Sequence, residues 1–204
     1  QRAQKGLGVL ACLQDGEFLG LTGIADEVRP EVKEAIAKAK QAGIKVVMVT
    51  GDNELTARTI GEEIGLLSEG DEIMTSSQLS DLNEEELLRR IDKVKIFARI
   101  TPEEKLRIVK AYQSLGETVA VTGDGVNDVL ALKQAAVGVS MGITGTDVSK
   151  EASDIILLDD NFATLITAIE QGRLIYNNIL KVIKFLLTGN LSEMLLIIIA
   201  VILG

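Results

Sequence analysis

Short runs of apolar, mostly β-branched residues alternate with longer amphipathic segments along most of the chain. The predicted strands are Gly16–Leu21, Lys45–Val49, Lys95–Ala98, Thr118–Val121, Val137–Val139 and Ile155–Leu158. Several of them are continuous apolar runs, which is typical of parallel strands that are covered on both faces. The alternation of strands and helices predicts an α/β fold with one doubly wound, mainly parallel sheet.

The predicted helices are marked by the residue types at their ends. Pro30 suits a first helical turn, and Gly43 ends the amphipathic pattern that follows it. A second helix is predicted over about Glu54–Ile64, and a third begins at Thr101-Pro102, where an N-cap residue precedes an N1 proline. Residues 68–90 are polar and acidic, so we expect a surface insertion with one short helix there.

The C-terminal part of the chain has a different pattern. Strand signals end at Asn161, and a long helical pattern continues into Phe185–Gly204, where Glu193 is the only ionisable side chain. A helix of about 20 residues is about 30 Å long, which matches the hydrocarbon core of a bilayer. We therefore predict a membrane-spanning helix; the alternative is a core helix of a soluble domain. Since the chain begins with Gln1 and stops at this apolar stretch, we expect it to be a piece of a longer protein.

The composition excludes several classes of chemistry. The 204 residues contain no His, so a Ser-His-Asp triad, a Cys-His dyad and an imidazole metal site are all excluded. The single Cys12 excludes an internal disulfide and a four-thiolate zinc site. A formal net charge of −9 argues against a nucleic-acid partner, because phosphate backbones are bound by basic surfaces. The remaining chemical groups are carboxylates, lysine, arginine, hydroxyls, amides and bound cations.

Three polar clusters follow predicted strands, at the edge where open α/β sheets bind ligands. They are Thr50-Gly51-Asp52, then Arg99 with Lys105, and then the run TGDGVND from Thr122 to Asp128. Glycines let backbone N–H groups approach an anion, and no G-x-G-x-x-G run of a dinucleotide site is present in them. Asp124 and Asp128 can converge on one hard cation, and Lys105 can neutralise phosphoryl oxygens. Together the clusters predict an Mg²⁺-dependent phosphoryl-transfer site.

This ordered set of clusters resembles the phosphorylation domain of P-type cation-transporting ATPases, which are members of the haloacid-dehalogenase-like superfamily. The runs DEVRP at residues 26–30, GTD at 145–147, ASD at 152–154 and DDNF at 159–162 are similar to further stretches of that family. The resemblance implies four parts. They are the end of a nucleotide-binding domain and hinge at 1–25, the phosphorylation domain at 26–162, a stalk helix at 163–184 and a transmembrane helix at 185–204.

The resemblance also implies roles for the residues of the three clusters. Asp124 and Asp128 would hold Mg²⁺, and Lys105 would neutralise the transferred phosphoryl group. The implied catalytic residues are Thr50, Lys105, Asp124 and Asp128. The implied ligands of ATP and of its phosphoryl group are Thr50, Gly51, Asp52, Arg99, Lys105 and Asn127, of which Asp52 and Arg99 would lie near the nucleotide.

The apolar C-terminal segment contains a polar pair of its own. Asn190 and Glu193 are three residues apart and therefore share one face of a helix. A carboxylate at membrane depth is energetically expensive and functional by default. The alternatives are that Glu193 lies near the membrane interface or faces a neighbouring helix as a neutral acid. Asn-x-x-Glu here resembles the cation ligands of the fifth transmembrane helix of type II pumps. An amide oxygen with a carboxylate suits a hard cation, and Ca²⁺ is favoured.

Two features depart from the family pattern. The nucleophile motif Asp-Lys-Thr-Gly-Thr is absent from the 204 residues, and in the family it precedes the nucleotide-binding domain. We therefore expect it upstream of Gln1, and we expect the chain alone to be catalytically inactive. A sheet that lacks the strand carrying this motif would have unpaired edges and low stability. In addition, Val129-Leu130 replace the usual Ala-Pro after Asn127-Asp128.

The sequence thus predicts part of an ATP-driven P-type cation pump, with Ca²⁺ as the favoured cargo. Its partners would be ATP, Mg²⁺, the transported cation, the lipid bilayer and the remaining N-terminal part of the pump, and no nucleic acid is expected. The parent protein would be a multi-pass membrane protein with a cytoplasmic catalytic domain. The alternatives are a fragment of a soluble haloacid-dehalogenase-like phosphatase and a truncated, non-catalytic membrane partner of a complete pump.

Overall fold

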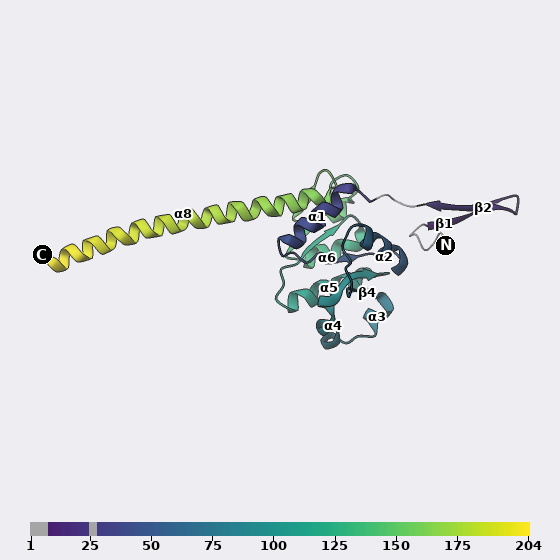
Figure 1. Ribbon diagram of the computed structural model, residues 1–204, viewed down its shortest axis with the longest axis horizontal. Helices are drawn as coiled ribbons and strands as arrows, with labels where there is room; N and C mark the ends of the chain where they lie inside the picture. Colours follow the sequence, from purple (N-terminus) through teal and green to yellow (C-terminus); the bar gives the residue numbers. More distant parts are fainter. Residues whose placement is uncertain (1–7, 25–27) are drawn as a thin grey trace. The chain divides into compact units, whose positions relative to one another are not determined.

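The computed structural model describes residues 8–24 and 28–204, and it divides into two compact units, Gln1–Ala163 and Thr164–Gly204. In chain order, the elements are β1 (Gly8–Gln14), β2 (Glu17–Ile24), α1 (Pro30–Gln41), β3 (Met48–Val49), α2 (Glu54–Glu63), β4 (Glu72–Thr75), α3 (Ser76–Ser80), α4 (Glu84–Arg90), η2 (Ile91–Lys93), β5 (Val94–Ala98), α5 (Pro102–Ser114), β6 (Ala120–Gly123), η3 (Val126–Asp128), α6 (Val129–Gln134), β7 (Val137–Met141), α7 (Asp147–Glu151), β8 (Ile155–Leu157) and α8 (Phe162–Leu203) (Figure 1). Parallel strands alternate with helices from α1 onward, which confirms the predicted α/β class.

β1 and β2 form an antiparallel hairpin around the turn Asp15-Gly16. Both turn residues have a positive φ, 50° and 87°. An Asp-Gly pair between two apolar runs is a typical sequence for such a turn. β2 corresponds to the predicted strand Gly16–Leu21, whereas β1 was not predicted, although the Asp-Gly pair signals it. The predicted boundary between residues 25 and 26 lies outside the described residues.

The first parallel sheet has the strand order β3-β5-β4. In its central strand, Ile96 and Ala98 pack in a cluster with Ile36 of α1 and Ala57 of α2. Phe97, between them in sequence, packs in a second cluster with residues of α5. Because successive strand residues point to opposite faces, β5 is covered on both sides, as its apolar sequence predicts.

The segment 68–90 corrects the prediction of a surface insertion with one short helix. It contains β4, α3 and α4, and Met74, Leu79 and Leu87 are at most 1% exposed. All three belong to the cluster that contains α5 residues such as Ile108. The prediction was wrong because acidic residues dominate the local composition, whereas the burial arises from contacts with a helix that lies later in the sequence.

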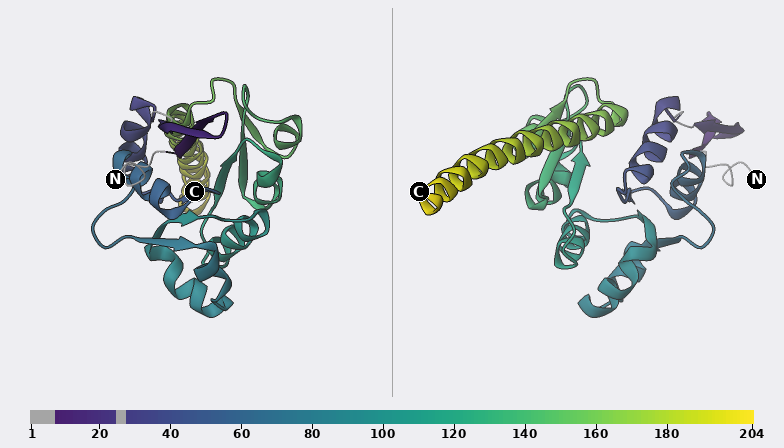
Figure 2. Two further views of the ribbon diagram at one scale, coloured as in Figure 1. Left: turned by 90° about the vertical axis from the view of Figure 1, so that its right-hand side faces the viewer. Right: turned by 60° about the vertical axis from the view of Figure 1, so that its left-hand side comes forward.

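The second parallel sheet has the strand order β6-β7-β8. A side chain at Gly138 of β7 would meet the carbonyl oxygen of Leu132 at 2.7 Å, so glycine is what lets α6 approach this strand. The described strands thus pair in two three-stranded parallel groups (Figure 2), and their alternation with helices confirms the predicted doubly wound α/β class. β3 and β6 each have one hydrogen-bonded neighbour among the described strands.

The second unit is formed by α8, which begins at Phe162 and continues as one helix of 42 residues (Figure 1). Its most apolar window has a mean hydropathy of 2.2 and is 0% buried. By length and composition the helix can cross a membrane, as predicted.

Candidate phosphoryl-transfer site

The loops after β3 and β5 are joined by backbone hydrogen bonds. The N–H of Arg99 donates to the carbonyl of Asp52 at 2.9 Å, and the N–H of Ile100 donates to the carbonyl of Thr50 at 3.0 Å. Arg99 has a φ of 59°, a left-handed conformation that is uncommon for residues other than glycine. Strained backbone of this kind persists where surrounding contacts hold it, and it concentrates at functional sites. The structure therefore brings the backbones of Thr50, Asp52 and Arg99 together.

Thr50 and Asp52 form a small polar turn at the end of β3. The Thr50 hydroxyl donates to Asp52 Oδ2 at 3.0 Å and accepts from the Asp52 N–H at 3.1 Å. No atom lies within 4 Å of the position of a side chain at Gly51, so packing does not require glycine there. The next residue, Asn53, caps α2 by accepting from the N–H of Thr56 at 3.0 Å. The turn thus presents open backbone and a hydroxyl beside a helix N-terminus, which suits an anionic ligand.

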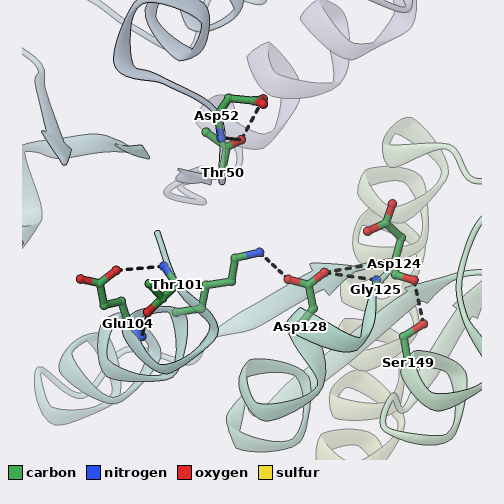
Figure 3. Close-up of polar contacts among 9 residues, drawn as sticks. Thr50, Asp52, Thr101, Glu104, Asp124, Gly125, Asp128 and Ser149 are labelled. Carbon is green, nitrogen blue, oxygen red and sulfur yellow. Dashed lines mark hydrogen bonds and ion pairs between the residues drawn. The ribbon is translucent and has the colours of Figure 1, made fainter. Parts of the chain in front are cut away.

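Lys105 and Asp128 form the central ion pair of the site, with Lys105 Nζ 2.6 Å from Asp128 Oδ1 (Figure 3). The side chains are only 19% and 12% exposed, so the pair is largely removed from water. Asp128 Oδ2 accepts from the N–H groups of Asp124 and Gly125, each at 3.3 Å. A carboxylate withdrawn from water needs such partners for its charge. The same pair links the start of α5 to the turn after β6.

A capping box fixes the helix that carries Lys105. The Thr101 hydroxyl accepts from the N–H of Glu104 at 3.3 Å, and Glu104 Oε2 accepts from the N–H of Thr101 at 2.9 Å. Glu104 Oε1 also accepts from the hydroxyls of Ser76 and Ser80. Burial by itself raises the pKa of Glu104, but these hydrogen bonds outweigh it and lower the pKa below its usual value. The predicted start of this helix at Thr101-Pro102 is confirmed.

The main chain of Asp124 is held by residues that follow β7. Its carbonyl accepts from the N–H of Thr146 at 2.9 Å and from the hydroxyl of Ser149 at 3.1 Å. Ser149 is completely buried. Figure 3 shows that the Asp124 carboxylate points away from Asp128. Ser149 was not among the predicted site residues, and its only signal in the sequence is its place in the first turn of a helix begun by Thr146.

Gly123 lets Asp128 lie directly against the end of β6. A side chain at residue 123 would collide with Asp128 Cβ and would meet Asp128 Cγ at 2.8 Å. At Gly125 the nearest Asp128 atom, Oδ2, would be 3.8 Å away, which is an ordinary contact. The two glycines of the TGDGVND run therefore have different functions, because only the first is required by packing.

The predicted site residues form two groups. Lys105, Asp128 and the backbone of Asp124 are in contact, and Asn127 lies beside them in η3. The turn that contains Thr50 and Asp52 is a separate group, and Figure 3 draws no interaction between the two. Asn190 and Glu193 lie in α8, in the other unit.

The donor set fits a magnesium ion only in part. Within residues 8–24 and 28–204 there is no cluster of three or more acidic or cysteine side chains that could hold a metal. Mg²⁺ is usually bound by one or two carboxylates together with substrate phosphates and water. Asp124, which is exposed, and Asp128 each offer one carboxylate to such a set. The Asp124 carboxylate points away from Asp128, however, so the structure does not show the predicted convergence of the two on one cation.

Residues 2–136 match the family of haloacid dehalogenase-like hydrolases. The chain belongs to this family. The α/β fold predicted from the sequence agrees with this membership.

The chain is also strongly similar to P-type ATPases. It is 53% identical over 191 residues to a calcium-transporting ATPase of Bacillus subtilis, covering 94% of this chain and 22% of that protein. It is 44% identical over 203 residues to the sodium/potassium-transporting ATPase subunit alpha-3 of Oreochromis mossambicus, covering 86% of this chain and 20% of that protein. The crystal structure of a zinc-transporting PIB-type ATPase in an E2.Pi state matches with a TM-score of 0.67 at 28% identity. The match covers 88% of this chain and 25% of that one. The chain thus spans about a fifth of the length of the curated relatives it matches.

Proposed function

We propose that this chain supplies part of the phosphoryl-transfer site, and one transmembrane helix, of an ATP-driven P-type cation pump. The observation that carries the proposal is the ion pair of Lys105 and Asp128 beside Asp124. It lies at the end of a parallel strand, in a chain that is 53% identical to a calcium-transporting ATPase. A fixed cation, two carboxylates and backbone N–H groups are the elements that phosphoryl transfer needs, because positioning and charge neutralisation supply most of the catalysis.

Each group has a distinct part in this proposal. Lys105 balances the negative charge of the transferred phosphoryl group, and its ion pair with Asp128 fixes where the ammonium lies. Asp124 and Asp128 hold Mg²⁺, which supplies further positive charge when bound. Asn127 completes the surroundings of the metal and the phosphate. Thr50 and Gly51 bind phosphoryl oxygens, and Asp52 and Arg99 lie toward the nucleotide of ATP.

The nucleophile is proposed to arrive on a strand outside this chain. β3 and β6 each lack a hydrogen-bonded neighbour on one side among the described strands. Val47 and Val49 at the first strand and Val119 just before the second all pack against the same apolar cluster. One parallel strand paired with both edges would join the two sheets and place an aspartate at its carboxyl end, near Lys105 and Thr50. Without that aspartate no phosphoenzyme forms, so the chain alone is inactive.

The transported cation is proposed to bind at Asn190 and Glu193 of α8. The two residues lie on the same helix face, and neighbouring hydroxyls are already used within the helix. Thr188 donates to the carbonyl of Lys184 and Ser192 donates to the carbonyl of Thr188, each at 2.8 Å. The amide oxygen of Asn190 and the carboxylate of Glu193 are the oxygen ligands in this proposal. Ca²⁺ is favoured, because an amide oxygen with a carboxylate suits this hard cation.

A chimera tests the proposal directly. This chain replaces the matching segment of the Bacillus subtilis calcium-transporting ATPase, and phosphoenzyme is measured with γ-labelled ATP. We expect a Ca²⁺-dependent, hydroxylamine-sensitive acyl phosphate, which Asp124→Asn abolishes. The matched control is Glu85→Gln, whose carboxylate forms an exposed i,i+4 ion pair with Arg89. A membrane-inserted chimera that forms no phosphoenzyme would overturn the proposal.

The cation ligands are tested in the same chimera with Glu193→Gln. We expect phosphorylation from ATP to require a much higher Ca²⁺ concentration, because one charged oxygen ligand is lost. Ser192→Ala is the control, since its hydroxyl is bonded within the helix. Unchanged Ca²⁺ dependence in the Glu193 variant would remove this part of the proposal.

A further inference from the structure

Asp160 has an unusual conformation and an unusually complete set of hydrogen bonds. It lies between β8 and α8 and has a φ of 51°, in the left-handed region. One carboxylate oxygen accepts from the N–H of Ile143 at 2.9 Å. The other accepts from the N–H and the hydroxyl of Thr144, at 2.7 and 2.8 Å. Its carbonyl accepts from Arg29 Nη1 at 3.0 Å. A non-glycine residue in this strained conformation is retained where such contacts hold it.

The loop that Asp160 holds, residues 142–146, has little room for other conformations. A side chain at Gly142 would meet the carbonyl oxygen of Leu157 at 2.8 Å, and one at Gly145 would collide with the Met141 carbonyl. The N–H of Gly142 also donates to the carbonyl oxygen of Leu157 at 2.8 Å. Both ends of the loop are therefore packed closely on the backbone of the second sheet.

The same loop ends at the residue that holds Asp124. The N–H of Thr146 donates to the Asp124 carbonyl at 2.9 Å, and Thr146 caps the helix whose Ser149 donates to that carbonyl as well. Two short steps therefore connect Asp160 to Asp124, from its carboxylate to Thr144 and along the backbone to Thr146. None of the groups in this connection belongs to the side chains assigned to phosphate or metal.

We propose that Asp160 is a positioning residue, whose carboxylate sets the loop 142–146 and thereby the backbone of Asp124. The effect of this positioning on activity rests on the proposed function above, in which Asp124 holds Mg²⁺. A carboxylate is required because the groups that its two oxygens contact, the N–H of Ile143 and the N–H and hydroxyl of Thr144, are all donors. In Asp160→Asn the amide NH₂ would replace one acceptor and would face an N–H group of Ile143 or Thr144.

Amide hydrogen exchange in the full chain in detergent tests the structural half. In Asp160→Asn we expect the exchange rate to rise about tenfold or more at Ile143 and Thr144, because their N–H groups lose charge-assisted hydrogen bonds to the carboxylate. We expect the same rise at Thr146, because the loop that holds its N–H against the Asp124 carbonyl is no longer fixed. The matched control is Asp154→Asn, whose carboxylate accepts from the N–H of Gly138 at 2.8 Å, at the other end of β7. That variant should raise exchange at Gly138 and leave Thr146 unchanged. Unchanged exchange at Thr146 in Asp160→Asn would overturn the inference.

The chimeric pump tests the functional half. With Asp160→Asn we expect the Mg²⁺ concentration for half-maximal phosphorylation to rise about three- to tenfold, while the apparent affinity for Ca²⁺ stays the same. Thr144→Val should have a smaller effect and Thr144→Ser should behave as the unmodified chimera, since serine keeps the hydroxyl donor. These milder variants also decide the question if Asp160→Asn does not fold. An unchanged Mg²⁺ requirement in both Asp160→Asn and Thr144→Val would refute the positioning role.

The two proposals can fail separately. A chimera without phosphoenzyme would refute the pump function, whereas exchange at Thr146 would still report whether Asp160 positions the loop. Normal phosphorylation with unchanged exchange would refute only the role of Asp160.

Discussion

Replacement of Gly123 by Ala perturbs the site with the smallest possible change, the addition of one methyl group. The new Cβ would collide with Asp128 Cβ and would lie 2.8 Å from Cγ and 3.0 Å from Oδ2. Asp128 cannot move freely, because Lys105 holds one oxygen at 2.6 Å and two backbone N–H groups hold the other. Either this ion pair or the end of β6 must shift.

The magnitude follows from the packing. Extra methyl groups in close-packed sites destabilise proteins by about 1–3 kcal/mol, which corresponds to a fall in Tm of roughly 2–12 °C for a chain of this size. Gly125→Ala is the matched control, because the nearest atom, Asp128 Oδ2, would lie 3.8 Å from its Cβ. Its effect should stay within about 0.5 kcal/mol, as for an unstrained surface substitution.

The assay is thermal and urea unfolding of the full chain in detergent, with a double-mutant cycle. In an Asp128→Gly background the colliding side chain is absent, so Gly123→Ala should lose most of its effect and show a coupling energy of about 1 kcal/mol or more. A Gly123→Ala chain as stable as the Gly125→Ala chain would refute the reasoning. An equal loss of stability in both backgrounds would place the strain elsewhere than at Asp128.

Three further predictions concern stability. Tyr112→Phe removes the hydroxyl that donates to the buried carbonyl of Ile91 at 3.1 Å, so the free energy of unfolding should fall by about 1–2 kcal/mol. A variant as stable as the wild type in urea would contradict this. For Asp160, burial acts to raise the pKa, but the hydrogen bonds from Ile143 and Thr144 outweigh it and hold the pKa at about 2, below the usual 3.8. Because the folded pKa is depressed, the contribution of this group is complete above about pH 4 and is lost as the pH falls toward 2, so the difference in urea midpoint between the wild type and Asp160→Asn should vanish over that window. A difference that persists at pH 2 would show that ionisation is not its source. Finally, the full chain in detergent should melt below about 60 °C, because β3 and β6 each have an unpaired edge among the strands that the structure describes. A cooperative transition above that temperature would contradict the expectation.

Elements with strong local signals were predicted well from the sequence. The helix that begins at Thr101 has an N-cap threonine and an N1 proline, and both act within one turn. Ile96, Phe97 and Ala98 of β5 are consecutive apolar residues, as expected for a strand that is covered on both faces. The polar clusters were also placed correctly at strand ends. Strand boundaries were less accurate, since β3 is only Met48–Val49 and not Lys45–Val49.

Elements that depend on distant partners were missed. β4 was not predicted, because it lies in an acidic segment and its burial depends on contacts with residues such as Ile108 of α5. Ser149 and Asp160 were not recognised as supports of the site, because their hydrogen-bond partners are distant in sequence. Ser149 contacts a residue 25 positions away, and Asp160 contacts residues 16 and 17 positions away. Residue type and spacing carry no information on such contacts.

The sequence by itself determined the α/β class, the order of the three polar clusters and the apolar helix, because these depend on periodicity and on residues within a few positions of each other. Only the tertiary structure decided that the strands form two sheets, that Lys105 pairs with Asp128, and that Asp160 holds the loop leading to Asp124. These features require hydrogen bonds and packing between segments that the chain brings together only when it folds.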